Sequence, residues 1–264
     1  MLFRSSVKKV IVAESRAIYG EGKYKCDSCG IVYPVARTEK DMISGDFRVK
    51  CPECNKSVNL VATDENSKLH PTSVYGITKQ VQGQLVHCVC QALGISSVSF
   101  RYQNVYGPGQ SLKNPYTGIL SIFSNSLRQN HDINIFEDGT ESRDFVYIDD
   151  VADATILAID NAKCSGMAFN IGTGTSIDVV TVANELKEFY KSNSEIKISG
   201  NFRLGDIRHN YADISLAKKI LGYQPKYNFE EGLAKFCEWV LTQPIEHDNY
   251  KKSLDEMKMK GLYK

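Results

Sequence analysis

Two cysteine pairs in the first quarter of the chain have a spacing typical of metal ligands. Cys26 and Cys29 form the first pair, Cys51 and Cys54 form the second, and 21 residues separate the pairs. Four thiolates can close a tetrahedral zinc site, because each Cys-x-x-Cys turn presents two sulfurs to one side of the metal. We therefore predict a structural zinc held by these four cysteines. The alternatives are four free thiols in a loop and, less favoured, a redox pair.

A tyrosine and a lysine with the spacing of a catalytic pair lie at the start of a long predicted helix. Tyr75 and Lys79 are four residues apart, so they share one face of that helix, and the lysine can stabilise a tyrosinate. The same spacing recurs at Tyr19 and Lys23, but the glycines between them disfavour a stable helix there. We therefore single out the later pair.

A hydroxyl group is available near the end of the first predicted strand. Ser15 follows the β-branched run at residues 7–12, and α/β sheets bind their ligands at the carboxyl ends of strands. Taken alone, this residue would be an ordinary turn serine. Together with the tyrosine and the lysine, it becomes a candidate third member of a catalytic group.

The elements that must position these side chains alternate between strands and helices. Short apolar runs predict strands at residues 7–12, 97–100, 133–136, 143–147 and 168–171. Amphipathic segments predict helices at residues 73–94, 117–128, 149–161, 181–191, 215–221 and 229–241. This alternation predicts an α/β fold with a parallel sheet in the front half of the chain. We expect the charged tail after Pro244 to be peripheral.

Composition excludes several classes of partner. The 264 residues carry a net charge of +1, and no apolar run approaches the roughly 20 residues that cross a bilayer. Residues 21–56 contain seven Lys and Arg against six Asp and Glu, so the cysteine segment lacks the clustered positive charge of a nucleic-acid surface. The N-terminus is not a secretory signal, and the remaining cysteines are scattered. These features favour a cytoplasmic protein without a nucleic-acid or membrane partner.

Five segments, in order along the chain, resemble the extended short-chain dehydrogenases/reductases of the NAD-dependent epimerase/dehydratase family. The matching stretches are VIVAESRAIYG, VYGITKQ, SFRYQNVYGPGQ, SRDFVYIDDVADA and FRLGDIRHNYADIS. The resemblance implies a partial Rossmann-like sheet followed by a smaller, mixed substrate domain. The cysteine insertion and the loop RYQNVYGPGQSLKNPYTG are most similar to those of dTDP-L-rhamnose 4-epimerases.

The resemblance implies roles for seven residues and a need for NAD. The predicted catalytic residues are Ser15, Tyr75 and Lys79, of which the last two would also contact the cofactor. The predicted contacts to a nucleotide-sugar substrate are Asn104, Arg143, Arg203 and Asp206. Tyrosine would act as the general base on the sugar 4-hydroxyl, and NAD would carry the hydride of a transient 4-keto intermediate.

Two local features bear on the reaction type. Dehydratases of this group carry an Asp-Glu pair directly after the serine, where this sequence has Arg16 and Ala17, which favours an epimerase. A dehydratase or simple oxidoreductase, and a non-catalytic zinc-ribbon scaffold, remain the alternatives. Glu14 departs from the small hydroxyl residue that the group often has beside its serine.

The cofactor half of such an enzyme is expected to be incomplete here. No GxxGxxG or GxGxxG turn occurs, and we interpret GTGTS at residues 172–176 as a strand-end turn. At about 30 residues per βαβ unit, we expect roughly 100 preceding residues to be missing and the chain alone to be inactive. We assign 1–20 and 57–124 to the NAD domain, 21–56 to the zinc ribbon and 125–264 mainly to the substrate domain. A homodimer or a complementing N-terminal chain is the expected partner.

Overall fold

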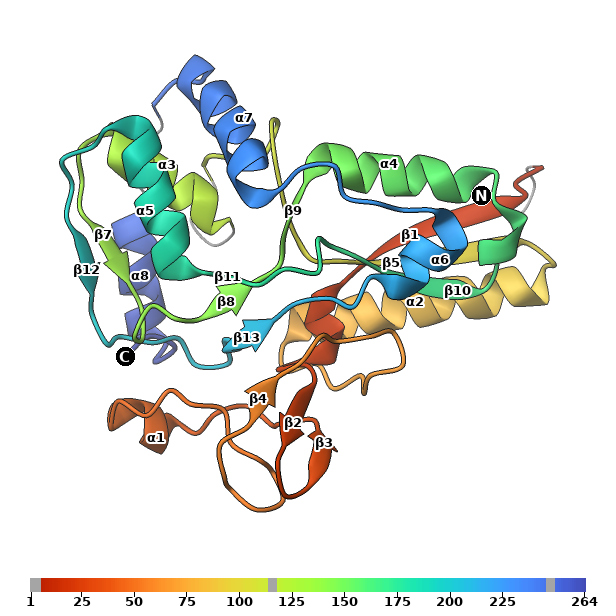
Figure 1. Ribbon diagram of the computed structural model, residues 1–264, viewed down its shortest axis with the longest axis horizontal. Helices are drawn as coiled ribbons and strands as arrows, with labels where there is room; N and C mark the ends of the chain where they lie inside the picture. The colour runs from red at the N-terminus through yellow and green to blue at the C-terminus, as the bar shows by residue number, and fades with distance from the viewer. Residues whose placement is uncertain (1–5, 114–117, 246–249) are drawn as a thin grey trace.

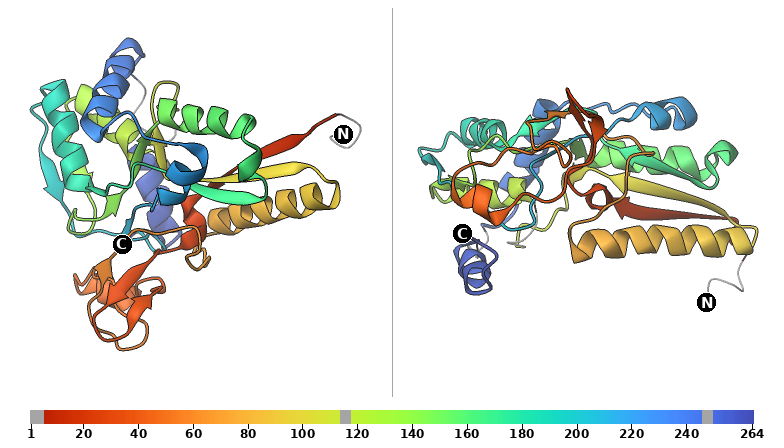
Figure 2. Two further views of the ribbon diagram at one scale, coloured as in Figure 1. Left: turned by 45° about the vertical axis from the view of Figure 1, so that its right-hand side comes forward. Right: turned by 90° about the horizontal axis from the view of Figure 1, so that it is seen from below.

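A computed structural model describes residues 6–113, 118–245 and 250–264. Its central sheet has three parallel strands in the order β1-β5-β10, whose bounds are Lys9–Ser15, Ser96–Tyr102 and Met167–Ile171. Helix α2 (Val74–Ala92) covers one face of this sheet, and α4 (Ile148–Ile159) and α6 (Ser215–Leu221) lie on the other (Figures 1 and 2). The predicted α/β fold with a parallel sheet is confirmed.

Helix α2 begins and ends where capping residues dictate. Ser73 is the N-cap, and its Oγ accepts a hydrogen bond from Gly76 N at 3.0 Å. At the other end, Gly94 adopts a φ of +65°, a left-handed conformation that stops a helix at little steric cost. The helix turns its smallest residues toward the sheet, since Gly76 and Gly83 are buried. It can therefore lie close to β1.

The opposite face of α2 is apolar but exposed. Its exposed side chains recur at helical spacing: Val74, Ile77, Val81, Leu85 and Val89. An apolar stripe of this kind marks a surface that another protein element is suited to cover.

A second core is formed by the C-terminal half. Helices α3, α5 and α7 pack with short strands β6, β7, β9 and β12 around buried aromatic and aliphatic side chains. The helices are α3 (Ile119–Arg128), α5 (Val179–Tyr190) and α7 (Phe229–Thr242). The strands are β6 (Asn104–Tyr106), β7 (Ile133–Ile135), β9 (Phe145–Tyr147) and β12 (Ile196–Ile198). Three two-residue strands, β8, β11 and β13, connect this half to the sheet, with bounds Ser142–Arg143, Ile177–Asp178 and His209–Asn210.

Residues 21–60, called the ribbon below, fold as a separate small unit (Figure 1). It contains an antiparallel sheet in the order β3-β2-β4 and a short helix, α1, with bounds Gly30–Val32, Tyr24–Cys26, Asn59–Leu60 and Glu39–Ile43. Its own core combines Tyr24, Val32 and Val49 with the cysteines. This compact unit is consistent with an insertion between β1 and α2, although the domain boundaries stay a prediction.

The tail after Pro244, which was predicted to be peripheral, is anchored to the fold at its last residues. The tail forms α8 (Tyr250–Met259), and its last residues then pair with the segment that follows residue 201. Phe202 N donates to Lys264 O at 2.9 Å, and Tyr263 is buried. The charged sequence of the tail gave no sign of this pairing, because it joins segments about 60 residues apart. Residues 246–249 of this tail lie outside the described residues.

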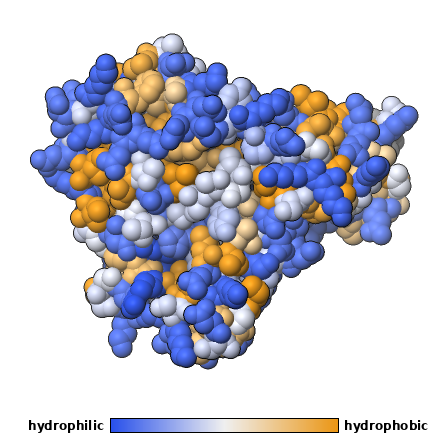
Figure 3. All heavy atoms as spheres, in the orientation of Figure 1, coloured by the Kyte–Doolittle hydropathy of each residue, from blue (hydrophilic) through white to orange (hydrophobic). Residues whose placement is uncertain are grey.

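Hydrophilic and hydrophobic residues are interspersed on the face that Figure 3 shows. Among the described residues, helices of the length and apolar character needed to cross a bilayer are not found. This agrees with the absence of a long apolar run in the sequence.

Candidate active site

The three predicted catalytic residues lie at the carboxyl end of β1. Ser15 is the last residue of this strand, and its Oγ accepts a hydrogen bond from Ala17 N at 3.2 Å in the short 3-10 helix η2 (Arg16–Tyr19). Lys79 Nζ donates to Ala13 O on the same strand at 3.0 Å. Its ammonium group is 5.9 Å from the centre of the Tyr75 ring. Strand β1 and helix α2 thus bring the three side chains to one edge of the sheet.

A glycine makes this approach possible. A Cβ at position 76 would lie 2.6 Å from Ala17 O, which is closer than van der Waals contact allows. Gly76 follows Tyr75 directly, so it lets the first turn of α2 rest against η2. The Tyr75 side chain remains 56% exposed, as is suitable for a group that must meet a ligand.

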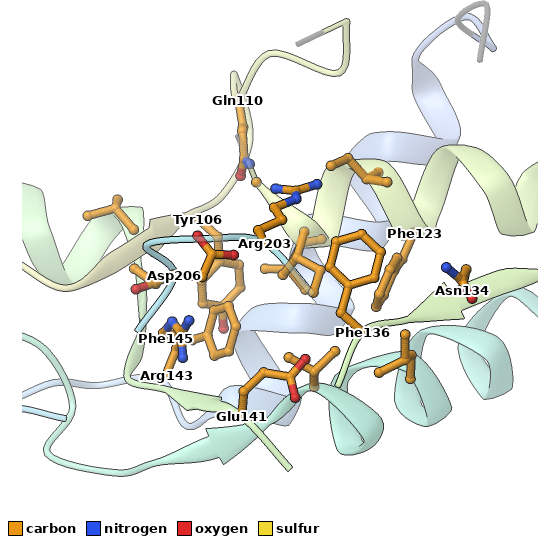
Figure 4. A pocket seen from close by; sticks show the side chains of 18 residues that line it. Tyr106, Gln110, Phe123, Asn134, Phe136, Glu141, Arg143, Phe145, Arg203 and Asp206 are labelled. Atoms are coloured by element: carbon orange, nitrogen blue, oxygen red, sulfur yellow. The ribbon is translucent and has the colours of Figure 1, made fainter. Parts of the chain in front are cut away.

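The four predicted substrate residues line one pocket of about 460 Å³ (Figure 4). They come from separate elements, since Asn104 begins β6, Arg143 ends β8, and Arg203 and Asp206 lie on the segment before β13. Apolar and aromatic side chains line the rest of the pocket, among them Tyr106, Phe123, Phe136 and Phe145. The pocket therefore combines cationic and amide groups with ring surfaces.

Two arginines in this pocket are held by their surroundings. Arg143 donates to Arg208 O at 2.9 Å from Nη1 and to Ile207 O at 2.7 Å from Nη2. The guanidinium of Arg203 lies over the Phe136 ring, 5.0 Å from its centre. Neither the backbone acceptors of Arg143 nor the aromatic ring beside Arg203 cancels the arginine charge, so both groups can attract an anion.

Several polar atoms in the pocket lack a hydrogen-bond partner among the described residues. They are Gln110 Oε1, Arg203 Nε and Glu141 Oε2, and all three are buried, although Glu141 Oε2 forms an ion pair with Arg208 Nη1 at 3.6 Å. A buried polar group without a partner is costly, so its presence in a pocket indicates a polar ligand. Burial also raises the pKa of Glu141 to about 7. This carboxyl group can therefore change charge near neutral pH.

Arg16 lies next to this pocket and contacts one of its lining residues, which the sequence did not reveal. Its Nε donates to Asn104 Oδ1 at 3.1 Å. Burial, reinforced by the neighbouring Arg143, lowers the pKa of Arg16 to about 9, so the side chain is still charged at neutral pH. Its position next to Ser15 was the available signal. Through Asn104, it connects the turn after β1 with the pocket, whose lining does not itself include Ser15, Tyr75 or Lys79.

The GTGTS segment is a strand-end turn, as predicted. Thr173 N donates to Asp144 Oδ1 at 2.8 Å, and Gly174 N donates to Asp144 Oδ2 at 3.0 Å. Asp144 is fully buried, and it also accepts a hydrogen bond from Ala212 N. The turn's amides are therefore used within the fold and are not presented to a phosphate.

The four ribbon cysteines converge. Their sulfur atoms all lie within 4.8 Å of one another, and Cys26 Sγ is 3.6 Å from Cys54 Sγ. Zinc–sulfur bonds of about 2.3 Å in a tetrahedron separate the sulfurs by about 3.8 Å, so the cluster fits zinc. Hydrogen bonds from the amides of Ser28 and Cys29 lower the pKa of the Cys26 thiol to about 7. The pKa values of the neighbouring Cys29 and Cys54 thiols are raised, so Cys26 is the most readily ionised of these three.

Comparison with known proteins identifies similar sequences among nucleotide-sugar epimerases. Residues 52–172 match the NAD dependent epimerase/dehydratase family. The dTDP-L-rhamnose 4-epimerase of Burkholderia thailandensis is 34% identical over 244 residues, which are 92% of this chain and 65% of that protein. The chain therefore spans about two thirds of the length of that relative.

Solved structures share the fold. The UDP-glucose 4-epimerase of Thermotoga maritima, solved with UDP-glucose, has a TM-score of 0.69 and 31% identity, covering 91% of this chain and 65% of that one. MoeE5, solved with UDP-glucuronic acid and NAD, has a TM-score of 0.70 and 26% identity, covering 91% and 67%. Both extend well beyond the part that this chain matches.

Proposed function

We propose that this chain, which carries a domain of the NAD dependent epimerase/dehydratase family, binds a nucleotide sugar and supplies the catalytic residues of a 4-epimerase. The observation that carries the proposal is the pocket. It is lined by all four residues predicted to contact the substrate, and it contains buried polar atoms without partners among the described residues. The similarity to the Burkholderia enzyme favours dTDP-L-rhamnose as the substrate type.

The pocket would hold the nucleotide part of the substrate. Arg143 and Arg16 supply positive charge beside Asn104, a combination that suits a diphosphate. The ring of Phe136 and the guanidinium of Arg203 supply flat surfaces for the nucleoside. The sugar would then extend from Asn104 toward the carboxyl end of β1.

The chemical step falls to Ser15, Tyr75 and Lys79. The tyrosine oxygen would take the proton of the sugar 4-hydroxyl, the lysine would stabilise the tyrosinate, and the serine hydroxyl would orient the reacting oxygen. NAD supplies the hydride acceptor that this chemistry needs. Tyr75 and Lys79 suit the ribose end of the cofactor, because both side chains are accessible at the sheet edge.

The sequence has no glycine-rich turn for the cofactor pyrophosphate. We therefore propose that these 264 residues alone bind NAD weakly and do not turn over substrate, and that additional residues complete the cofactor site. A second copy or a complementing chain is suited to cover the exposed apolar stripe of α2. The cytoplasmic location stays a prediction.

The ribbon cysteines are proposed to hold one structural zinc. The support is the convergence of four sulfur atoms within 4.8 Å and their division into two turns that each supply two ligands. Since all four positions are taken by protein ligands, zinc would leave no open position for a substrate.

Calorimetric titration of the purified chain tests the function. We expect dTDP to bind with a micromolar Kd and NAD to bind much more weakly. Lack of dTDP binding at millimolar concentration would contradict a nucleotide pocket. Micromolar NAD binding would contradict an incomplete cofactor site. Measurable turnover of the chain alone in an epimerase assay with dTDP-L-rhamnose would contradict it as well.

A further inference from the structure

We infer that the ribbon supports the nucleotide pocket, and that Arg37 is the ribbon residue that positions it. The inference rests on the proposed function in one respect, since it takes the 460 Å³ pocket to be the nucleotide site. The ribbon lies against the C-terminal half, beneath the segment that contains Arg203 and Asp206 (Figure 1). That segment therefore has the pocket on one side and the ribbon on the other.

Arg37 reaches from the ribbon into the wall of the pocket. Its two terminal nitrogens donate to the two carboxylate oxygens of Glu137, at 2.6 Å and 2.9 Å. Nη2 also donates to the backbone oxygen of Asp206 at 2.9 Å. The Arg37 and Glu137 side chains are only 4% and 5% exposed. One guanidinium thus joins the two chain segments that form this wall.

The ion pair belongs to a larger, mostly buried network of charged side chains. Arg208 Nη1 donates to Glu137 Oε2 at 2.6 Å, and Arg208 N donates to Glu21 Oε2 at 2.9 Å. Glu21 and Arg37 come from the ribbon, while Glu137 and Arg208 come from the C-terminal half. Arg208 also pairs with Asp138 and Glu141, so two guanidinium groups serve four carboxylates. Removing Arg37 would leave the buried carboxylates short of a positive partner.

The backbone conformation of Glu137 also depends on this network. Its φ is +51°, a left-handed conformation that is unfavourable for a residue with a side chain. Surrounding contacts must therefore hold it in place, and the paired guanidinium of Arg37 is one of them. Its neighbour Phe136 carries the ring under Arg203 in the pocket. A change at Glu137 would therefore reach the pocket lining directly.

An apolar contact adds to the polar one. Met42 and Phe47 of the ribbon form a small buried core with Phe202 and Leu204, and the rings of Phe47 and Phe202 are 6.3 Å apart. Arg203 lies between these two residues and lines the pocket. Adjacent side chains of an extended segment point to opposite sides. The ribbon therefore holds the neighbours of Arg203 while Arg203 itself faces the ligand.

The experiment compares two arginines of the ribbon. Arg37→Met removes the guanidinium that joins the ribbon to Glu137 and Asp206. Arg48→Met removes a guanidinium whose side chain is 72% exposed and pairs with Asp46 inside the ribbon. For Arg37→Met, we expect faster amide hydrogen exchange at residues 202–208, at least tenfold weaker dTDP binding and unchanged zinc content. For Arg48→Met, we expect wild-type values in all three measurements.

Wild-type exchange and dTDP affinity in Arg37→Met would overturn the inference. Exchange needs no ligand, so it separates the two proposals: faster exchange without any dTDP binding to the wild type would support the ribbon contact and refute the nucleotide pocket. Faster exchange at residues 202–208 with unchanged exchange in α2 and α4 would separate a local effect from a general loss of stability, because a bound ligand slows exchange in either case. If Arg37→Met does not fold, Arg37→Lys keeps the charge without the planar fork, and the same comparison decides.

Discussion

Arg16 and Asn104 are joined by a hydrogen bond of 3.1 Å, which links the turn after β1 to the first residue of β6. Ser15 precedes this arginine, and Asn104 lines the pocket. The contact therefore couples the proposed place of proton transfer to the proposed place of diphosphate binding. A single side chain can in this way affect both binding and the position of the sugar.

Arg16→Met should weaken dTDP binding by about 10-fold to 100-fold. The physical reason is the loss of a partly buried, charged hydrogen-bond donor, an interaction that contributes about 1.5–3 kcal/mol. Calorimetric titration measures the Kd, and thermal unfolding serves as a check that the variant is folded. An unchanged Kd would show that Arg16 supports only the local structure.

Tyr75→Phe should abolish epimerase turnover in the protein whose cofactor site is complete, with a loss of at least about 100-fold. Binding of dTDP should be unchanged, because this residue is outside the pocket lining. Its side chain is 56% exposed, so the midpoint of thermal unfolding should also be nearly unchanged. Retained turnover would remove Tyr75 from the mechanism and favour the scaffold alternative.

Gly76→Ala should destabilise the fold by about 1–3 kcal/mol, despite the higher helix propensity of alanine. The added methyl group would lie 2.6 Å from the backbone oxygen of Ala17, which cannot move as a flexible side chain can. Turnover should fall as well, since Tyr75 would shift away from Ser15. Denaturant unfolding measures the effect, and Cys88→Ala on the exposed face of α2 is the control. Equal stability of the two variants would show that the η2 backbone can shift to accommodate the added methyl group.

Glu141→Gln should remove a pH dependence of stability. Burial raises the pKa of Glu141 from 4.5 to about 7, so folding favours the neutral acid. The resulting stability is fully present below about pH 4.5 and is lost as the pH rises through about 7. The stability difference between wild type and variant should therefore shift by on the order of 1–3 kcal/mol across that window. A flat difference between pH 4.5 and 8 would contradict the raised pKa.

Cys51→Ser should reduce the zinc content of the purified chain from about one ion to well below one. Hydrogen exchange should become faster in residues 24–60, because the ribbon core includes the cysteines. The far-ultraviolet circular dichroism of the helices should change little, since α2 and α4 lie outside the ribbon. Cys88→Ser, at an exposed cysteine, is the matched control. Global unfolding on zinc loss would show that the ribbon is required for the whole fold.

Periodicity and capping were sufficient to predict much of the fold. Helix α2 was predicted at residues 73–94 and lies at 74–92, and α6 lies at residues 215–221 as predicted. The signals that define these elements are local. The pairing of the tail with Phe202 and Leu204 was missed because nothing near residue 262 encodes a partner 60 residues away.

The pocket also shows that local sequence signals do not predict long-range contacts. Its four predicted residues were found through family motifs, and the structure places all four in its lining. Arg37 carries no motif, and its partners Glu137 and Asp206 are 100 and 169 positions away. Only the folded chain brings these groups together, so their relationship could not be read from spacing.

The large sequence separation of the ribbon contacts also implies an order of folding steps during synthesis. The four cysteines lie between residues 26 and 54, so zinc could close the ribbon soon after it leaves the ribosome. Its docking partners, Glu137 and Arg208, are made much later, and contacts of such long sequence separation form slowly. The ribbon would then be the first unit to fold and would be anchored only later, and a pause before residue 137 would leave Arg37 without its docking partners.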